Sequence, residues 1–132
     1  MNQNRNEISE EEPICRYLFH SNNYSASNGR VRYNAFLPLN GETSVFRIKN
    51  LSEEEVWDIG QREIADRRNK ELKARGDVIA SSIYEVGLGL EPEISSHHLH
   101  ANIINWPKVK SEQILIARKV ADSAELHLNP NS

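Results

Sequence analysis

Short stretches in which hydrophobic and polar residues alternate predict most of the secondary structure of this chain. A period of two places successive side chains on opposite faces and is typical of a β-strand with one buried face. On this basis we expect strands at residues 14–20, 31–37, 43–48, 78–90, 98–104 and 126–128. The stretch at 78–90 alternates for the longest distance, and it predicts one long, half-buried strand.

Two other segments show helical spacing. Ser52 and Glu55 form a capping-box pattern followed by recurring apolar residues, which predicts a helix over residues 52–75 that stops at Gly76. A second helix is expected over residues 111–123. Its buried stripe would consist of Ile114, Ala117, Val120, Ala121 and Ala124.

The order of these elements is roughly β-β-β-α-β-β-α-β, which predicts an α+β fold. We expect a mostly antiparallel sheet of about five to six strands with two helices packed on one face. Residues 1–12 are polar and acidic, with too little apolar surface to offset the entropy of ordering, so they predict a flexible tail. Residues 13–129 would then form a single globular domain.

Composition narrows the class of protein. The chain has 132 residues, of which 38% are hydrophobic and 27% are charged, as is usual for globular domains. No apolar run reaches the ~18 residues of a membrane span, so no membrane partner is expected. The lone Cys15 cannot form an internal disulfide and the N-terminus carries no apolar leader, which together predict a cytoplasmic location.

Charge is unevenly distributed along the chain. The net charge is −3, yet residues 14–50 carry five basic residues against Glu42 alone, a local net charge of +4. Most of the aromatic residues fall in the same segment. Arginines interleaved with aromatic rings are typical of a surface that faces phosphate or nucleic acid. The alternative is that the aromatic residues form core while the arginines line a solvated edge of the sheet.

The segment around residue 100 holds the most distinctive candidate chemistry. On a strand, His98, His100 and Asn102 would project from one face. Such a face suits acid–base or phosphate-binding chemistry, or a metal if a third ligand joins it, but it is also compatible with a plain solvated strand face. No third ligand is clustered nearby, so neither a metal nor a cofactor is predicted. Ser44 has no adjacent histidine, and no Ser-His-Asp triad is predicted.

Four arginines are candidate anion ligands. Arg16 and Arg47 lie inside predicted strands, which would hold their planar guanidinium groups stiffly as anion clamps. Arg30 and Arg32 flank the turn-rich loop of residues 21–30 and could close over a ligand. For each of the four, the alternative is contact with solvent or with a structural carboxylate.

The chain also resembles a group of small bacterial proteins of unknown function that share a His-Ala-Asn-Ile-x-x-Trp-Pro segment before a closing helix and strand. The resemblance rests on HLHANIINWPKVKSEQILIARKVADSAELHLNP, RYLFHSNNYSASNGRVRYNAFLP and SVFRIKNLSEEEVWDIG, and it covers most of residues 14–129. It implies a bacterial, intracellular, single-domain protein whose gene could belong to a larger system, and it carries no catalytic assignment. The shared segment begins at His100, which favours His100 over His98.

The leading functional hypothesis is recognition of a phosphate-bearing ligand, either RNA or a nucleotide. His100 would be the acid/base group and Asn102 would orient the substrate. The ligand contacts would come from Arg16, Arg32, Arg47, His98 and Asn102. We expect His100 and Arg47 to act on one ligand if their strands are near neighbours.

Two alternatives belong to different classes of protein. The first is a non-catalytic accessory or immunity-type subunit, which would dock on a protein partner through the acidic tail or the charged helix 52–75. The second is a metal-dependent hydrolase that uses His98 and His100. The sequence leaves open whether the protein is an enzyme.

Overall fold

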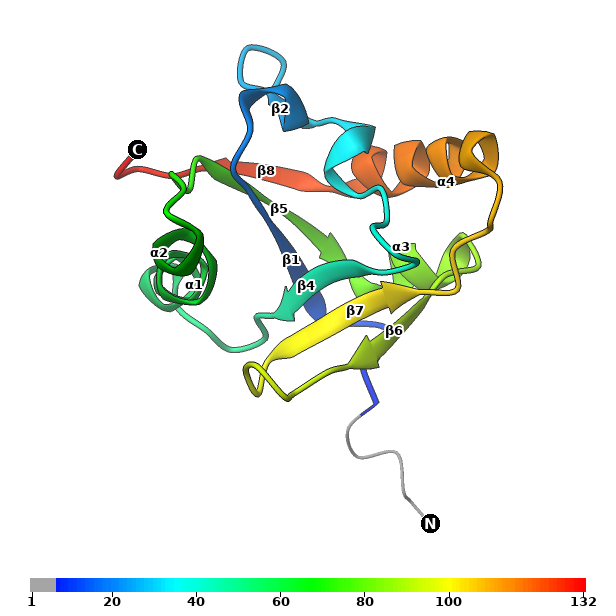
Figure 1. Ribbon diagram of the computed structural model, residues 1–132, viewed down its shortest axis with the longest axis horizontal. Helices are drawn as coiled ribbons and strands as arrows, with labels where there is room; N and C mark the ends of the chain where they lie inside the picture. The colour runs from blue at the N-terminus through cyan, green and yellow to red at the C-terminus, as the bar shows by residue number, and fades with distance from the viewer. Residues whose placement is uncertain (1–6) are drawn as a thin grey trace.

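A six-stranded antiparallel sheet forms the centre of the molecule (Figure 1). The computed structural model describes residues 7–132. Along the sheet the strand order is β6-β7-β4-β1-β5-β8, so the first strand of the chain lies in the middle. The strands are β1 (Pro13–Leu18), β4 (Thr43–Arg47), β5 (Ala74–Ile79), β6 (Gly89–Pro92), β7 (His100–Ile104) and β8 (Glu125–Leu128). A separate ribbon pairs β2 (Tyr24–Ser25) with β3 (Arg30–Val31).

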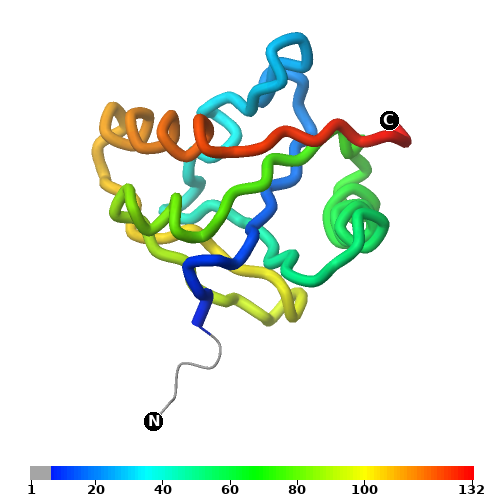
Figure 2. Tube along the Cα trace, turned by 180° about the vertical axis from the view of Figure 1, so that it is seen from behind, coloured from blue at the N-terminus to red at the C-terminus, as the bar shows by residue number. Residues whose placement is uncertain are grey.

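Helices cover both faces of this sheet. They are α1 (Glu53–Gly60), α2 (Asp66–Arg68), α3 (Ala80–Glu85) and α4 (Lys110–Ser123), and a π-helical turn, Gln61–Ala65, joins α1 to α2. Figures 1 and 2 show β1 and β5 between α1 and α4. The α+β class and the antiparallel sheet are therefore as predicted from the sequence. The distribution of the helices differs, because α1 does not share a face with α3 and α4.

Side-chain alternation along β1 explains this distribution. Ile14 and Leu18 point to one side of the sheet, which we call the apolar face, where they share a core with Ile83 of α3 and with α4. Cys15 and Tyr17 point to the opposite side, where they share a second, smaller core with α1. Because β1 is apolar on both sides, each face of the sheet needs its own cover.

The face beneath α1 also carries polar side chains, and we call it the polar face. Residues directly opposite each other on neighbouring strands point to the same side of the sheet. On the polar face such pairs are Ser44 with Asn102, Cys15 with Asp77, and Arg75 with His127. Its polar side chains include Ser44, Arg75, Asp77, Glu91, His100, Asn102, Glu125 and His127. Chemistry-bearing residues are thus concentrated on one side of the sheet.

The predicted long strand over residues 78–90 is wrong, because a helix interrupts it. β5 ends at Ile79, α3 follows at once, and β6 begins only at Gly89. Within α3, Ala80 and Ile83 are fully buried. Their spacing of three residues places both on one face of a helix, whereas a strand would point them to opposite faces. Because both side chains pack against the apolar face, this segment forms a helix.

The helix predicted over residues 52–75 begins as expected and ends early. Ser52 and Glu55 form the capping box, with the Glu55 amide donating to Ser52 Oγ over 3.1 Å. The helical segment stops at Asn69, which adopts a left-handed conformation with φ of 53°. Gly76 lies in β5, where a Cβ atom would come within 2.9 Å of Val31, so this glycine permits close packing and does not stop a helix.

The expected strand over residues 31–37 is reduced to the two residues of β3. A 3₁₀ turn, Tyr33–Ala35, follows it. The turn directs Ala35 and Phe36 into the core of the apolar face, where both are buried. Burial of two consecutive side chains is incompatible with a strand that has one wet face.

Part of the expected tail is packed. Ile8 is 2% exposed and belongs to the core of the apolar face. The carbonyl groups of Glu10 and Glu12 accept hydrogen bonds from the first amides of α3, which would otherwise lack partners. Residues 8–12, which we call the N-terminal strap, therefore belong to the folded body. The rest of the predicted tail, residues 1–6, lies outside the described residues.

Within residues 7–132, no helix combines the length and the apolar character that crossing a membrane requires.

Candidate functional site

The predicted residues His100 and Asn102 both lie next to Ser44, which was not predicted as a site residue. Ser44 of β4 lies directly opposite Asn102 of β7, and the neighbouring pair is Phe46 and His100. His100 Nε2 lies 2.7 Å from Ser44 Oγ. The imidazole is mostly buried, with 12% of its side chain exposed, and it meets Phe46 edge-on at a centroid distance of 5.3 Å. A histidine and a serine are thus held together by neighbouring strands.

The surroundings of the other ring nitrogen fix the tautomer of His100. Nδ1 lies 2.9 Å from the Glu93 carbonyl oxygen and 3.2 Å from Glu93 Oε1. Both neighbours are acceptors, so Nδ1 carries the proton and donates it to Glu93. In the neutral ring Nε2 is then an acceptor, and the Ser44 hydroxyl donates to it. This is the arrangement in which a histidine can act as a base toward a serine.

Glu93 is held in its ionised form. The Ser95 hydroxyl donates to Glu93 Oε2 over 2.5 Å. This hydrogen bond, with a smaller contribution from nearby His100, lowers the pKa of Glu93 below its usual value. An ionised carboxylate beside Nδ1 stabilises the imidazolium that forms when Nε2 accepts a proton.

Asn102 brings an uncommitted amide to the same place. The residue is only 6% exposed, and its side chain makes no hydrogen bond to any residue between 7 and 132. Among the described residues, the only fully buried side-chain nitrogen or oxygen without a hydrogen-bond partner is Trp106 Nε1, so the Asn102 amide keeps contact with solvent. The predicted role of Asn102 in orienting a substrate stays a prediction, and its location beside Ser44 is consistent with it.

Arg16 contacts the same strand from the apolar face. Its Nε donates to the Ala35 carbonyl over 2.9 Å, and its Nη1 donates to the Ser44 carbonyl over 2.8 Å. Burial lowers the pKa of the Arg16 guanidinium, and the neighbouring Arg68 cation lowers it further. Arg16 forms no ion pair with a carboxylate in the described part of the chain. Both recorded bonds go to backbone oxygens, so Arg16 braces β4 against the Tyr33–Ala35 turn.

Arg47 does not join His100. It follows Phe46 on β4, and strand alternation therefore directs it to the opposite face from His100. Its guanidinium pairs with Glu12, through Nε to Oε1 at 2.5 Å and through Nη2 to Oε2 at 3.0 Å. The expectation that Arg47 and His100 act on one ligand is wrong, because the two lie on different sides of the sheet.

His98 does not lie on the strand face with His100, because β7 begins at His100 itself. Instead, the His98 ring stacks on His97 at a centroid distance of 4.6 Å. His97 then meets Phe46 edge-on at 5.7 Å, beside His100. Residues 7–132 contain no group of three His, Cys, Asp or Glu side chains placed to hold a metal ion. The metal-dependent hydrolase stays a prediction.

Arg32 lies in a pocket formed by the predicted ligand-binding loop. The pocket has a volume of about 480 Å³ and lies between the β2–β3 ribbon, the Tyr33–Ala35 turn and α4. We call it the loop pocket. Its side chains are three arginines (Arg30, Arg32, Arg118), four small polar residues (Asn22, Ser25, Asn28, Asn34), Val31, Tyr33, Ala121 and Asp122.

The arginines of the loop pocket differ in their partners. Arg30 donates to Asp122 over 2.8 Å, and both side chains are about two-thirds exposed. The guanidinium of Arg118 lies 5.3 Å from the centre of the Tyr33 ring. Neither Arg32 nor Arg118 forms an ion pair within residues 7–132. The pocket therefore has a net positive charge of two.

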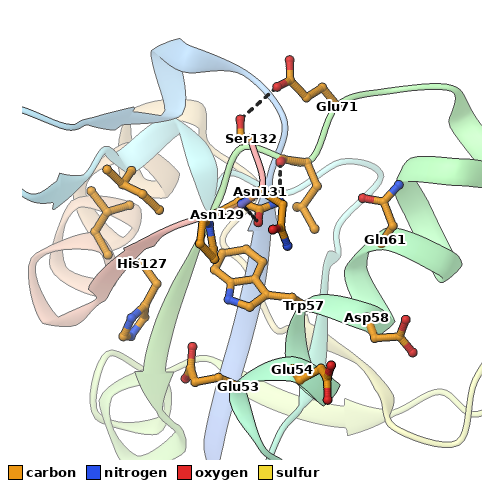
Figure 3. A pocket seen from close by; sticks show the side chains of 14 residues that line it. Glu53, Glu54, Trp57, Asp58, Gln61, Glu71, His127, Asn129, Asn131 and Ser132 are labelled. Atoms are coloured by element: carbon orange, nitrogen blue, oxygen red, sulfur yellow. Dashed lines mark hydrogen bonds between the residues drawn. The ribbon is translucent and has the colours of Figure 1, made fainter.

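A larger groove of about 1030 Å³ lies between α1 and the C-terminal segment (Figure 3). Its side chains include Glu53, Glu54, Asp58 and Glu71, so we call it the acidic groove. Figure 3 shows the Trp57 indole at its centre, with Glu53 and Glu54 on one side and Asn129, Asn131 and Glu71 on the other.

An ion-pair network forms the floor beneath the acidic groove. Arg75 is only 2% exposed, and it pairs with Glu53 at 2.8 Å and with Asp77 at 3.0 Å. It also lies 4.7 Å from the centre of the Trp57 ring. All three guanidinium nitrogens of Arg75 donate to Glu53 or Asp77, which is the arrangement of a structural ion pair. Burial raises the pKa of Asp77 above its usual value, and Arg75 opposes that shift.

Sequence reasoning missed the two partners of His100 and one arginine of the loop pocket. Ser44 is 56 residues away from His100 in sequence, and Arg118 lies on α4, far from the loop. Only strand pairing and helix packing bring such residues together. Glu93 is closer, seven residues before His100, but its contact depends on the turn between β6 and β7, which the sequence did not predict.

No protein-family model, curated protein or solved structure matches this chain. The resemblance to small bacterial proteins therefore stays a prediction, and the function is argued from the geometry alone.

Proposed function

We propose that the protein binds a phosphate-bearing ligand of nucleotide size in the loop pocket. The observation that carries this proposal is the set of three arginines around one cavity with a single carboxylate, Asp122, among them. Arg32 and Arg118 lack an ion-pair partner in the described chain, so their charges are available to an anion. A phosphate held by an arginine fork gains charge-assisted hydrogen bonds of roughly 1.5–3 kcal/mol each.

Size and chemistry agree with a nucleotide. The volume of about 480 Å³ lies within the range of ~300–1,000 Å³ that is typical of small-molecule sites. Tyr33 already stacks with Arg118, which fixes the orientation of its ring. The amide and hydroxyl groups of Asn22, Ser25 and Asn28 lie around the same cavity and can donate to and accept from a base or a ribose.

The pocket is built on rigid elements. β2 and β3 pair with each other, the Arg32 amide donates to the Asn23 carbonyl over 2.8 Å, and Asn34 bonds to Asn23 over 3.2 Å. The loop is therefore held before any ligand arrives, which reduces the entropy lost on binding. A free nucleotide and a nucleotide within an RNA chain share the base and the ribose, but the first offers a phosphomonoester and the second a singly charged phosphodiester.

Equilibrium binding measured by calorimetry tests the proposal. The ligands are AMP, inorganic phosphate and a short single-stranded RNA. We expect Arg32→Ala and Arg118→Ala each to weaken AMP binding by about tenfold, which corresponds to ~1.4 kcal/mol. The matched control is Arg62→Ala, because Arg62 is an exposed arginine paired with Asp58, away from the pocket. It should bind AMP like the unmodified protein.

The three ligands distinguish the sources of the phosphate. Tighter binding of AMP than of phosphate assigns the pocket to a nucleotide. A much higher affinity for RNA, with a steep dependence on salt, assigns it to a nucleic acid chain. No binding of any of the three, or equal loss in all variants including Arg62→Ala, contradicts the proposal.

A second candidate function is docking of a basic segment of a partner protein in the acidic groove. The specific observation is that the groove runs along α1 and beside β8, one of the two edge strands of the sheet. An extended chain can pair with such an edge. Within the described part of the predicted docking tail, Glu12 is buried against Arg47, whereas Glu10 and Glu11 are exposed.

An oligolysine peptide is a suitable probe for the acidic groove. Trp57 is half-buried there, so binding should change its fluorescence. Asp58→Lys should weaken binding several-fold, and Glu112→Lys, which places the same change on exposed α4, should not. Equal effects of the two substitutions would show that the peptide responds only to net charge.

A further inference from the structure

We propose that Ser44 is a nucleophile activated by His100, and that the polar face carries a second, esterase-type site separate from the loop pocket. The juxtaposition that points to it is Ser44 Oγ at 2.7 Å from His100 Nε2, with the opposite ring nitrogen held by Glu93. The substrate class is an ester of a small carboxylic acid.

The tautomer already derived sets the direction of proton transfer. Because Nδ1 donates to Glu93, the lone pair of Nε2 points at the Ser44 hydroxyl. A serine hydroxyl is a weak nucleophile on its own and becomes effective when a base removes its proton during attack. Glu93, whose pKa lies below its usual value, stabilises the positive charge that the ring then acquires.

Asn102 supplies the group that such a reaction needs next. Attack on an ester carbonyl creates a negatively charged oxygen, and a positioned donor stabilises it. Asn102 lies directly opposite Ser44, is 6% exposed, and has no hydrogen-bond partner among residues 7–132. Its side-chain N–H groups are therefore uncommitted beside the attacking oxygen. The Arg16 cation on the Ser44 carbonyl adds positive potential at the same residue.

The chemistry balances with water as the only co-reactant. Ser44 Oγ bonds to the ester carbonyl carbon while its proton passes to His100 Nε2. The bond from this carbon to the alcohol oxygen then breaks, and His100 returns the proton to the departing alcohol. A water molecule next attacks the acyl-serine with His100 again as base, which releases the carboxylic acid and restores Ser44.

The burial of Ser44 and His100 limits the size of the acyl group that the site can accept. Ser44 and His100 are both half-buried between neighbouring strands, so a bulky acyl group could not approach Oγ. An acetyl group is small enough to test the idea, and an activated acetate ester removes any demand for leaving-group recognition.

The experiment uses the full chain and p-nitrophenyl acetate, with two readouts. The first is the initial burst of p-nitrophenolate, and the second is the mass of the intact protein and of the peptide that contains Ser44. We expect a burst that approaches one equivalent and one acetyl group on Ser44. Ser44→Ala should abolish both, and His100→Gln should slow the burst by about a hundredfold or more.

Two further variants keep the inference falsifiable. Ser27→Ala is the matched control, because Ser27 is exposed and its only recorded side-chain partner is Ser25; it should react like the unmodified protein. If Ser44→Ala fails to fold, Ser44→Cys retains the shape, and its thiol should react with iodoacetamide while the fully buried Cys15 does not.

The outcomes separate this inference from the nucleotide proposal. Absence of acetylation at Ser44 in the folded protein, or the same burst in Ser44→Ala, overturns the nucleophile and leaves the loop pocket untouched. Acetylation at Ser44 with no AMP binding supports the nucleophile alone. A Ser44 that reacts equally well in His100→Gln is merely accessible, and that result also overturns the inference.

Discussion

The two faces of the sheet are built on different principles. On the apolar face, the side chains of β1, β4 and β7 meet α3 and α4 in a core whose members are almost all fully buried. On the polar face, α1 covers a smaller apolar cluster, and the rest of the surface consists of hydrogen-bonded polar side chains and ion pairs. Stability is concentrated on the first face, and the polar groups of the second remain available for chemistry.

The largest expected loss of stability comes from a substitution in the core of the apolar face. Phe36 is completely buried there, against Gly76 and Val31. We expect Phe36→Ala to lower the free energy of unfolding by about 3–5 kcal/mol, because it removes a large side chain and leaves a cavity. Urea denaturation followed by circular dichroism measures this. A loss below about 1 kcal/mol would show that the apolar face does not dominate stability.

The next effect concerns the N-terminal strap, which extends the apolar face. Glu12 is 6% exposed and pairs with the partly buried Arg47. We expect Glu12→Ala to cost about 2–3 kcal/mol, since it leaves the guanidinium without its carboxylate in a largely buried place. Glu11→Ala is the control, because Glu11 is exposed, and its melting temperature should stay close to that of the unmodified protein. Equal melting temperatures for both variants would mean that the strap is dispensable.

A third substitution, on the polar face, should increase the stability of the protein and reduce the reactivity of Ser44. Asn102→Leu replaces a mostly buried side chain, whose amide bonds to no residue between 7 and 132, with an apolar side chain of similar size. We expect the free energy of unfolding to rise by about 1 kcal/mol, because the leucine buries additional apolar surface, while acetylation of Ser44 slows at least tenfold. Residues kept for function are often unfavourable for stability. A loss of stability instead would show that the amide contributes to the fold.

The smallest effect is a pH dependence on the polar face. Burial lowers the pKa of His97 below its usual value of 6.5, and neighbouring His98 contributes in the same direction. The unfolded chain therefore binds this proton more readily than the folded one, and the free energy of unfolding falls as the pH decreases below about 6.5. His97→Gln should flatten this decline in thermal melts recorded between pH 7.5 and 5. An unchanged slope would assign the decline to other groups.

Local patterns in the sequence correctly predicted those helices and strands whose structure is determined by adjacent residues. The capping box at Ser52, the alternation in β1 and β4, and the buried stripe of α4 all depend on adjacent residues. The interruption at α3 could not be found in this way, because residues 78–90 alternate as a strand does, whereas α3 depends on burial of Ala80 and Ile83 on one face and on the strap that supplies hydrogen-bond acceptors to its first turn.

The candidate site was only partly predictable for the same reason. His100 and Asn102 were selected together, and the structure places both on the polar face. Arg47 was grouped with His100 although a one-residue step along β4 puts its side chain on the other face. His98 was preferred to His97 because the strand was expected to begin two residues earlier than it does. Ser44 became a candidate only through its register with β7.

The central position of β1 has a consequence for how the protein is made. β1 leaves the ribosome before β4 and β5, its neighbours in the sheet, and synthesis supplies these only several seconds later at about 5–20 residues per second. During that interval β1 exposes apolar side chains on both sides and two unpaired backbone edges, which are features that attract other nascent chains. A chaperone that shields the newly made N-terminal third would therefore be expected to raise the yield of folded protein more than one that acts after release.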